Sequence, residues 1–290
     1  MIQCDMTLRI GAHLSISGGL LNAIKSIKDK GGNCLQIFSS SPRTWSKSTI
    51  SRNDITTFLD AKKTSGVDPI FFHALYLINL ADPDQTGKKS VEALIHELSL
   101  APQLDVLGSI VHTGSFKNDN KTLSCRDKKN YKTLLTNINS VLENTPGESL
   151  LILENAGNRK IGQTIDQLCE IIQDVNNPRI RVCLDTCHLH AAEYDLRSKQ
   201  NYKRFLDEFD TKIGLDRLEV VHMNDSKDKL GDLRDRHENI GEGYVGVEVF
   251  TNFLNDPRTK MIPFIIETPG FDKQGPDKKN LDLLKGFVRE

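Results

Sequence analysis

The sequence lacks the features that would place the protein in a membrane or outside the cell. No stretch approaches the roughly 20 continuous apolar residues that a membrane-spanning helix needs. The first residues, MIQCDMTLRIGAH, contain neither the basic region nor the apolar run of a signal peptide. We therefore expect a soluble intracellular protein, in the cytoplasm or, in a eukaryote, the nucleus, with no membrane association.

Cysteine is sparse and shows no pairing motif. Six cysteines are scattered along 290 residues, and none forms a CxxC pair. In a reducing compartment such residues are typically small buried hydrophobic side chains rather than disulfide partners. The net charge of -1 argues neither for nor against nucleic acid as a partner. A protein that coats DNA is usually basic overall, whereas an enzyme that grips one short stretch needs only a local positive cleft.

Near-continuous apolar runs alternate with amphipathic segments along the whole chain. The runs that predict strands are 9–15, 34–40, 69–74, 106–114, 150–157, 180–188, 218–225 and 263–270. The clearest helical patterns are 18–31, 90–104, 164–175, 247–257 and 279–290. Apolar strands that alternate with helices indicate a parallel sheet, and eight such units in this length predict a closed (β/α)8 TIM barrel.

The chain shows no sign of a division into domains. No linker rich in proline, glycine or serine interrupts it, so we expect one domain over residues 1–290. Its most polar segment, 115–135, is expected to form a long loop that leads into a helix. A doubly wound open sheet is the alternative fold, but no GxGxxG motif follows the first predicted strand.

Six of the eight predicted strands end in a residue that can bind a metal ion. These residues are His73, His112, Glu154, Asp185, His222 and Glu267, with His188 just beyond Asp185. The C-terminal ends of barrel strands meet at one face of the barrel, where active sites lie. A single histidine after an apolar run is more often an ordinary buried residue, but the joint pattern favours a metal site. His13, on the first strand, could line the same face without binding metal.

A run of charged residues, DRHENIGEG at 235–243, follows the seventh predicted strand. Such a run usually forms a solvated loop. Asp235 and His237 are two residues apart, however, and alternate residues of an extended chain point to the same side, with Arg236 opposite. Adding this pair gives five imidazoles and four carboxylates, a mixture that suits zinc, with manganese and iron as alternatives. Nine ligands fit three ions if one carboxylate bridges two of them.

The blocks around these residues resemble the endonuclease IV family of apurinic/apyrimidinic (AP) endonucleases. They are GAHLS, FSSSPRTW, HALYLINLA, VHTGS, LENAG, LDTCHLHAAEYD, HMNDSK, DRHENIGEG and IETPG, and they extend from residue 11 to 270. The resemblance implies a (β/α)8 barrel with three zinc ions per chain. The implied ligands are His73, His112 and bridging Glu154 for the first ion; Glu154, Asp185, His222 and Glu267 for the second; and His188, Asp235 and His237 for the third, where Mn²⁺ is an alternative.

The activity that the resemblance implies is hydrolysis of the phosphodiester 5′ to an abasic site in double-stranded DNA. The products would be a 3′-hydroxyl and a 5′-deoxyribose phosphate, with Glu154 as the catalytic residue and with accessory 3′-phosphodiesterase or 3′-exonuclease activity. Arg43, Tyr76 and Leu77 would enter the duplex and fill the gap left by the flipped nucleotide. A monomer is expected. His190 stands where the family usually has an aromatic or aliphatic residue, and we interpret it as a loop residue.

Two other functions remain open at this point. A sugar isomerase or epimerase barrel also uses Glu, Asp and His at strand ends to hold one or two metal ions, but it has no use for the third group of ligands. A barrel that binds DNA or a partner without catalysis should have lost one or more ligands, and all nine are present. Measuring the number of zinc ions per chain would discriminate between the first alternative and an AP endonuclease.

Overall fold

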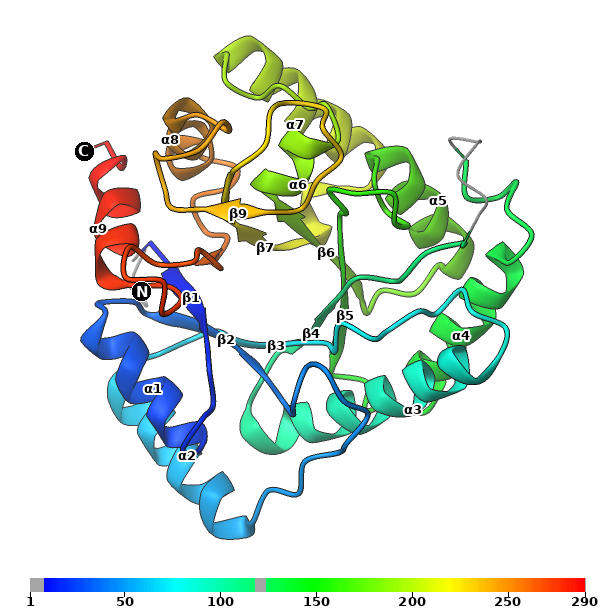
Figure 1. The fold of residues 1–290 in the computed structure, drawn as a ribbon. Helices are drawn as coiled ribbons and strands as arrows, with labels where there is room; N and C mark the ends of the chain where they lie inside the picture. The colour runs from blue at the N-terminus through cyan, green and yellow to red at the C-terminus, as the bar shows by residue number, and fades with distance from the viewer. Residues whose placement is uncertain (1–7, 118–123, 290) are drawn as a thin grey trace, which may run out of the picture.

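The computed structural model describes residues 8–117 and 124–289. Within these ranges, eight parallel strands close into a barrel with helices around it (Figure 1). The barrel strands are β1 (Ile10–Leu14), β2 (Cys34–Phe38), β3 (Ile70–His73), β4 (Gly108–Val111), β5 (Leu150–Glu154), β6 (Ile180–Asp185), β7 (Leu218–His222) and β10 (Phe264–Ile266). Each strand pairs with the next one along the chain, and β10 closes the ring between β7 and β1.

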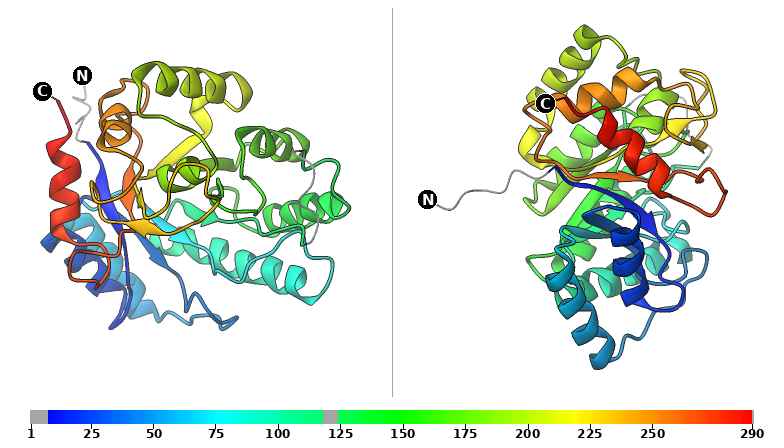
Figure 2. Two further views of the ribbon diagram at one scale, coloured as in Figure 1. Left: turned by 45° about the horizontal axis from the view of Figure 1, so that its top comes forward. Right: turned by 90° about the vertical axis from the view of Figure 1, so that its left-hand side faces the viewer.

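Helices follow the strands and form the outer layer, as two further views show (Figure 2). They are α1 (Leu20–Asp29), α2 (Arg52–Ser65), α3 (Gln85–Leu100), α4 (Tyr131–Glu143), α5 (Ile165–Val175), α6 (Thr186–Ala191), α7 (Lys199–Lys212), α8 (Val247–Asn255) and α9 (Lys278–Gly286), with short 3-10 helices η1 (Ala101–Leu104) and η2 (Leu215–Arg217). Two further short strands, β8 (Asp225–Ser226) and β9 (His237–Glu238), pair antiparallel outside the barrel.

The interior of the barrel holds an apolar layer of side chains. Its members are Cys34, Phe71, Ile110, Ile152, Cys183, Val220 and Ile265, one from each strand except β1. On β1 the corresponding residue is Gly11, where an added Cβ would lie 1.9 Å from the carbonyl oxygen of Cys34. Only glycine fits there without displacing backbone. The barrel is therefore filled below the C-terminal ends of its strands, as a packed core and not as a pore.

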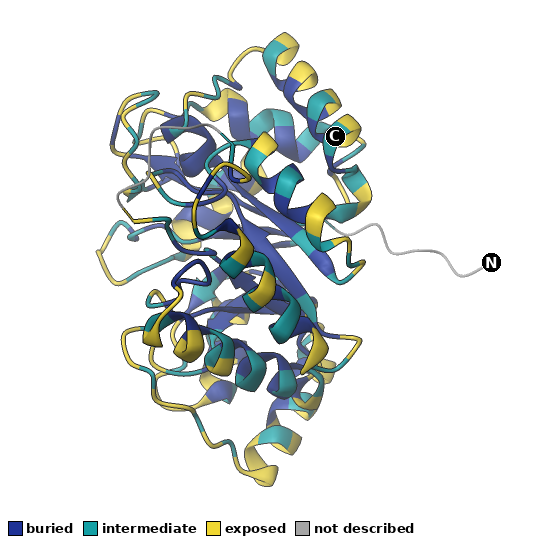
Figure 3. Ribbon diagram, turned by 90° about the vertical axis from the view of Figure 1, so that its right-hand side faces the viewer, coloured by how far each residue is buried: buried dark blue, intermediate teal, exposed yellow. Residues whose placement is uncertain are grey.

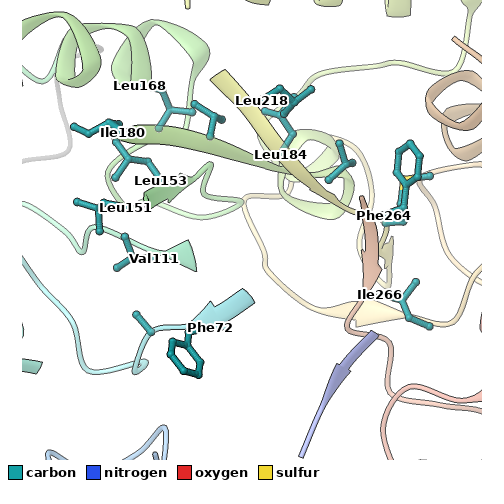
Figure 4. Close-up of a cluster of buried hydrophobic side chains, with 14 of the residues drawn as sticks. Phe72, Val111, Leu151, Leu153, Leu168, Ile180, Leu184, Leu218, Phe264 and Ile266 are labelled. Carbon is teal, nitrogen blue, oxygen red and sulfur yellow. The ribbon is translucent and has the colours of Figure 1, made fainter. Parts of the chain in front are cut away.

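The other face of each strand packs against the helices. Figure 4 shows members of this cluster, in which Leu151 and Leu153 of β5 lie near Leu168 of α5. The helix α5 places Leu168 and Ile172 on its buried face, and the Thr164 side chain caps its start by accepting the N–H of Gln167. Figure 3 shows the result, with the barrel strands mostly buried and the helices exposed on their outer sides.

The predicted (β/α)8 barrel is confirmed, with differences at element ends. The sixth strand ends at Asp185, because the Asp185 side chain caps α6 by accepting the N–H of His188. His188 therefore lies on a helix and not on the predicted strand. The polar segment 115–135 leads into α4, which begins at Tyr131, but residues 118–123 lie outside the described ranges.

The structure also describes five of the six cysteines and the length and polarity of the helices. Five cysteines are free and buried, and Cys4 lies outside the described residues. Among the helices in the described ranges, none is long and apolar enough to cross a membrane.

Candidate metal centre

A layer of polar side chains lies directly above the apolar layer of the barrel. Each member stands two residues after a member of the apolar layer or after Gly11, and alternate strand residues point to the same side. The members, from β1 around to β10, are His13, Gln36, His73, His112, Glu154, Asp185, His222 and Glu267. The period of two along eight strands thus gathers three predicted carboxylates and three predicted histidines at one level of the barrel. We call these eight residues the polar layer.

Glu154 lies at the centre of this arrangement, and its two oxygens face different groups of histidines. Its Oε2 atom is 3.3 Å from Nε2 of His73 and 3.3 Å from Nε2 of His112. Its Oε1 atom is 3.2 Å from Nδ1 of His188 and 3.3 Å from Nδ1 of His222. A carboxylate in this position can bridge two metal sites.

The imidazoles around the carboxylates hold Glu154 and Asp235 in their charged forms. Burial opposes charge on the Glu154 carboxyl, but the imidazoles of His112 and His222 outweigh it and hold its pKa well below its ordinary value. Burial also opposes charge on Asp235, and His188 outweighs it, so that the pKa of Asp235 is lowered as well. Burial lowers the pKa of His112 to about 4. At neutral pH these carboxylates are anionic and His112 is neutral, which are the forms that bind zinc. At His73, His188 and His222 the neighbouring acidic groups outweigh burial and raise the pKa of the imidazole, so that a metal ion would displace protons from these three rings.

The ligand atoms fall into groups in which all atoms lie within 4.8 Å of one another. One group is His73, His112 and Glu154, and a second is Glu154, Asp185, His222 and Glu267. These sets coincide with the first two sets expected from the sequence. The third expected set appears as overlapping groups, in which His188, Asp235 and His237 combine with His112, Asp185 or Cys187. Asp235 joins this set, since its Oδ1 atom lies 3.0 Å from Nε2 of His188 and 3.4 Å from Nε2 of His237.

Backbone carbonyl groups fix the tautomer of three of these histidines. In each case Nδ1–H donates to a carbonyl oxygen, which leaves the lone pair on Nε2. The pairs are His73 with Ala74, His188 with Asn155 and His237 with Glu267, at 2.8, 3.0 and 3.3 Å. Within the described ranges, Nε2 of His188 and Nε2 of His237 are buried without a hydrogen-bond partner. Two unpartnered imidazole nitrogens beside one carboxylate oxygen fit a metal cation.

Asp235 and His237 are carried by a loop that other residues hold in place. Arg236 points away from them and donates from Nε to Oδ2 of Asp228 at 2.7 Å, as the alternation along an extended chain predicts. The Asp228 side chain is only 4% exposed, whereas Arg236 is 54% exposed. His190 donates from Nε2 to the carbonyl oxygen of Asp228 at 3.2 Å. His190 is therefore a buried residue of α6, contrary to our interpretation of it as a loop residue.

The buried carboxylate of Asp225 holds the end of this loop by hydrogen bonds. Asp225 accepts the backbone N–H groups of Gly241, Gly243 and Val245 at 2.9, 3.1 and 3.0 Å. An added Cβ at Gly243 would lie 2.4 Å from Oδ1 of Asp225, so that this glycine is needed for the close approach. The glycine-rich end of DRHENIGEG thus closes the loop against β8.

A cavity of about 460 Å³ opens above the polar layer. Its lining includes His13, His73, His112, His188, Asp235, His237 and Glu267, together with Phe38 and Tyr76. This volume is in the range of small-ligand sites. Glu154, Asp185 and His222 lie beneath these residues and are fully buried.

The three residues expected to enter DNA lie on two loops beside the cavity. Tyr76 is 60% exposed, and its ring packs edge-on against Phe38 with 5.4 Å between centroids. Its backbone N–H donates to the carbonyl oxygen of Pro42 at 3.1 Å, which ties its loop to the loop that carries Arg43. Arg43 is exposed and Leu77 is partly buried. An aromatic side chain with this exposure at a cavity rim is free to contact a ligand.

Sequence reasoning did not assign several residues that support the centre. Gln36 was not singled out, although a polar residue inside the apolar run CLQIF was a readable signal. Asn224 donates from Nδ2 to Asp185 Oδ2 at 2.7 Å and accepts the N–H of Glu267 at 2.7 Å. Asn155 accepts the N–H of Asp185 at 2.6 Å. Asn155 follows Glu154 directly and Asn224 stands two residues after His222, but the partners of both asparagines are distant in sequence.

Comparison with known proteins gives one consistent result. The family model described as xylose isomerase-like TIM barrel matches residues 24–287. A relative from Halothermothrix orenii, named "Probable endonuclease 4", is 37% identical over 282 residues, which cover 96% of this chain and 99% of the relative. A protein of the same name from Chloroflexus aurantiacus is 34% identical over 285 residues, covering 97% and 98%.

Solved structures agree with the sequence comparisons. The crystal structure of endonuclease IV from Thermus thermophilus superposes with a TM-score of 0.83 at 32% identity, covering 96% of this chain and 98% of that one. A 3-keto-D-glucoside 4-epimerase from E. coli superposes with a TM-score of 0.68 at 16% identity, a likeness of fold alone. The near full-length matches above 30% identity carry the assignment: the chain belongs to the endonuclease IV family.

Proposed function

We propose that this protein is a DNA-repair AP endonuclease that hydrolyses the phosphodiester 5′ to an abasic site. The observation that carries the proposal is the convergence of nine side chains beneath one cavity, with an oxygen of Glu154 toward each of two ligand groups. The relatives that are more than 30% identical over nearly their whole length are named for an endonuclease. The products would be a 3′-hydroxyl and a 5′-deoxyribose phosphate.

The donor atoms fit three zinc ions. His73, His112 and Glu154 would hold the first ion, Glu154, Asp185, His222 and Glu267 the second, and His188, Asp235 and His237 the third. Mixed nitrogen and oxygen ligation with three or four protein ligands per ion is typical of zinc. Zinc bound there would lower the pKa of water to near neutral and offset charge on the phosphate.

The chain's own residues would position the substrate. Tyr76 is exposed at the rim of the cavity, and with Leu77 it would stack in the gap that an abasic nucleotide leaves in the duplex. Arg43, on the adjoining loop, would pair with a backbone phosphate. Flipping the target out of the stack costs least where no base is paired, which would direct the enzyme to abasic sites.

A sugar isomerase or epimerase on the same barrel is the competing function. Such an enzyme has no role for the loop-borne pair Asp235 and His237, nor for an aromatic side chain that is 60% exposed at the rim. Three bound zinc ions per chain would favour the endonuclease, and one or two would favour the sugar enzyme.

The experiment that tests the function is incision of a duplex with a single tetrahydrofuran abasic analogue, with the product ends mapped. This analogue resists β-elimination, so a 3′-hydroxyl at the nick establishes hydrolysis on the 5′ side. The matched undamaged duplex is the control. Cleavage of both duplexes at equal rates, or of neither duplex in the presence of zinc, would contradict the proposal.

A further inference from the structure

Gln36 is a buried amide in the wall of the metal centre. It lies on β2 between Leu35 and Ile37, and its exposed fraction is 0%. It is the uncharged, non-histidine member of the polar layer, so its side chain reaches into the same space as the expected ligands. A buried carboxamide requires hydrogen-bond partners, since an unsatisfied one loses its hydrogen bonds to water without replacement.

Both ends of the Gln36 amide contact expected ligands of the second ion. Its Nε2 atom donates to Oε1 of Glu267 at 2.6 Å, and its Oε1 atom is 2.7 Å from Nε2 of His222. The Glu267 carboxylate only accepts hydrogen bonds, which assigns the NH₂ end of the amide to it. The oxygen end therefore faces His222 and accepts from Nε2–H.

This assignment determines which atoms His222 and Glu267 present to a metal ion. With the proton on Nε2, the lone pair of His222 is on Nδ1, which lies 3.3 Å from Glu154 Oε1 and 3.8 Å from Asp185 Oδ2. With Oε1 of Glu267 bound to Gln36, and with Nδ1 of His13 2.8 Å from the same oxygen, Oε2 of Glu267 lies 3.6 Å from Nδ1 of His222. Nδ1 of His222 and Oε2 of Glu267 therefore both face the second ligand group, which also contains Glu154 and Asp185.

His222 differs from the other histidines whose tautomers are fixed. The tautomers of His73, His188 and His237 are set by backbone carbonyls, which a substitution cannot remove. That of His222 is set by a side chain. A single substitution at Gln36 therefore tests the orientation of His222 and Glu267 without changing either ligand.

We propose that Gln36 is a positioning residue for the second metal ion, fixing the tautomer of His222 and the orientation of Glu267. The proposal rests on the proposed function, because it assumes that these residues bind metal. Hydrogen-bond partners of metal ligands typically raise metal affinity by about 10- to 100-fold. Gln36 would supply that effect for two ligands of the same ion.

The test compares the zinc affinity of Gln36→Met with that of Cys34→Ala, measured by competition with a chelating dye. Met keeps the length of the side chain and removes the hydrogen bonds of the amide to Glu267 and His222, together with its 2.8 Å contact from Nε2 to Nδ1 of His13. Cys34 lies on the same strand and the same face, in the apolar layer beneath. We expect one ion of Gln36→Met to bind about 10- to 100-fold more weakly, and Cys34→Ala to bind all its zinc as the wild type does.

A second background shows that the weakened ion is not the third. In the double variant Gln36→Met/His237→Ala, the third ion should be lost, and of the two remaining ions one should bind about 10- to 100-fold more weakly. If Gln36→Met does not fold, Gln36→Leu removes the same hydrogen bonds. Unchanged affinity in a folded variant would overturn the role of Gln36 while leaving the proposed function intact. A wild-type protein that binds no zinc would overturn the proposed function itself.

Discussion

The candidate metal centre has two parts that are built in different ways. One part consists of barrel residues such as Glu154, Asp185 and His222, whose side chains are 0% exposed and whose positions follow from the pleat of the strands. The other part consists of Asp235 and His237, whose side chains are 27% and 17% exposed on a loop outside the barrel. The barrel strands therefore position the first part, whereas the second part depends on contacts within its loop.

Those loop contacts are few and specific. Asp228 holds Arg236, and Asp225 holds the glycine-rich return of the loop. Residues on loops open more readily than strands buried in a barrel. We therefore expect the third ion to exchange faster than the first two, and we expect substitutions to affect the two parts separately.

The largest effect should come from substituting Glu154, which lies at the centre of the barrel part of the site. Glu154→Gln keeps the volume of the side chain and removes the charge that faces both ligand groups. We expect incision of abasic duplex to fall by at least about a hundredfold, equivalent to roughly 2.7 kcal/mol. The fold, followed by circular dichroism, and DNA binding should persist. A variant that kept more than about a tenth of the wild-type rate would show that Glu154 does not have this role.

The rim of the cavity should affect binding of the duplex but not the chemistry. Tyr76→Ala should remove stacking of about 1–3 kcal/mol, a scale taken from single-strand base stacking. We expect weaker binding and slower incision of abasic duplex, with little change in hydrolysis of a small activated phosphodiester that needs no flipping.

The matched control is Tyr244→Ala. Tyr244 is also an exposed aromatic residue, at 54%, and the cavity lining within the described ranges does not include it. Equal losses on both substrates in Tyr76→Ala would mean that Tyr76 supports the metal site instead. No loss on either substrate would mean that it only packs against Phe38.

A substitution remote from the ligands should weaken the loop part alone. Asp228→Asn removes the charge that pairs with Arg236, the residue between Asp235 and His237 in the sequence. We expect the affinity for the third ion to fall by about tenfold, with the first two ions unaffected. The control is Asp232→Asn, an exposed residue of the same loop. Parallel loss of all three ions on zinc titration would argue that the two parts are not separate.

The smallest effect concerns a carboxylate buried outside the polar layer. Glu97 of α3 accepts hydrogen bonds from Ser39 and Ser109, and burial raises the pKa of its carboxyl above the ordinary 4.5. Charge on Glu97 therefore destabilises the folded state at pH values above the raised pKa. The penalty disappears as the pH falls towards 4.5.

The pH dependence of the free energy of unfolding tests whether charge on buried Glu97 destabilises the folded state. The difference between wild type and Glu97→Gln should shift in favour of the wild type as the pH falls from about 7 towards 4.5, because only the wild type gains a proton there. Titration of the metal ligands is common to both proteins and cancels. A difference that moves in favour of the variant on acidification would contradict the effect of burial on Glu97.

The sequence was sufficient to predict the barrel and the convergence of six members of the polar layer, but not of Gln36. Apolar runs that end in His73, Glu154 or His222 predict both a strand and the end at which a site lies, because parallel strands share one direction. The spacing of Asp235 and His237 also predicted the outward direction of Arg236. These predictions depend only on local periodicity.

What the sequence could not supply depends on contacts between distant residues. The cap that Asp185 places on α6 moves His188 from a strand onto a helix, although the sequence continues in an apolar run. The roles of Gln36 and Asp228 arise from partners that only the closed barrel and the folded loop bring near. Such hydrogen bonds have no periodic signal in the sequence.

The most direct test of a centre in two parts is elemental analysis of zinc in wild type and in His237→Ala, with Glu242→Ala, an exposed residue of the same loop, as the control. His237 is one of three protein ligands proposed for the third ion, whereas the ligands of the first two ions remain. We expect three zinc ions per chain in the wild type and the control, and two in His237→Ala. Loss of all three ions in His237→Ala, or retention of all three, would contradict this expectation.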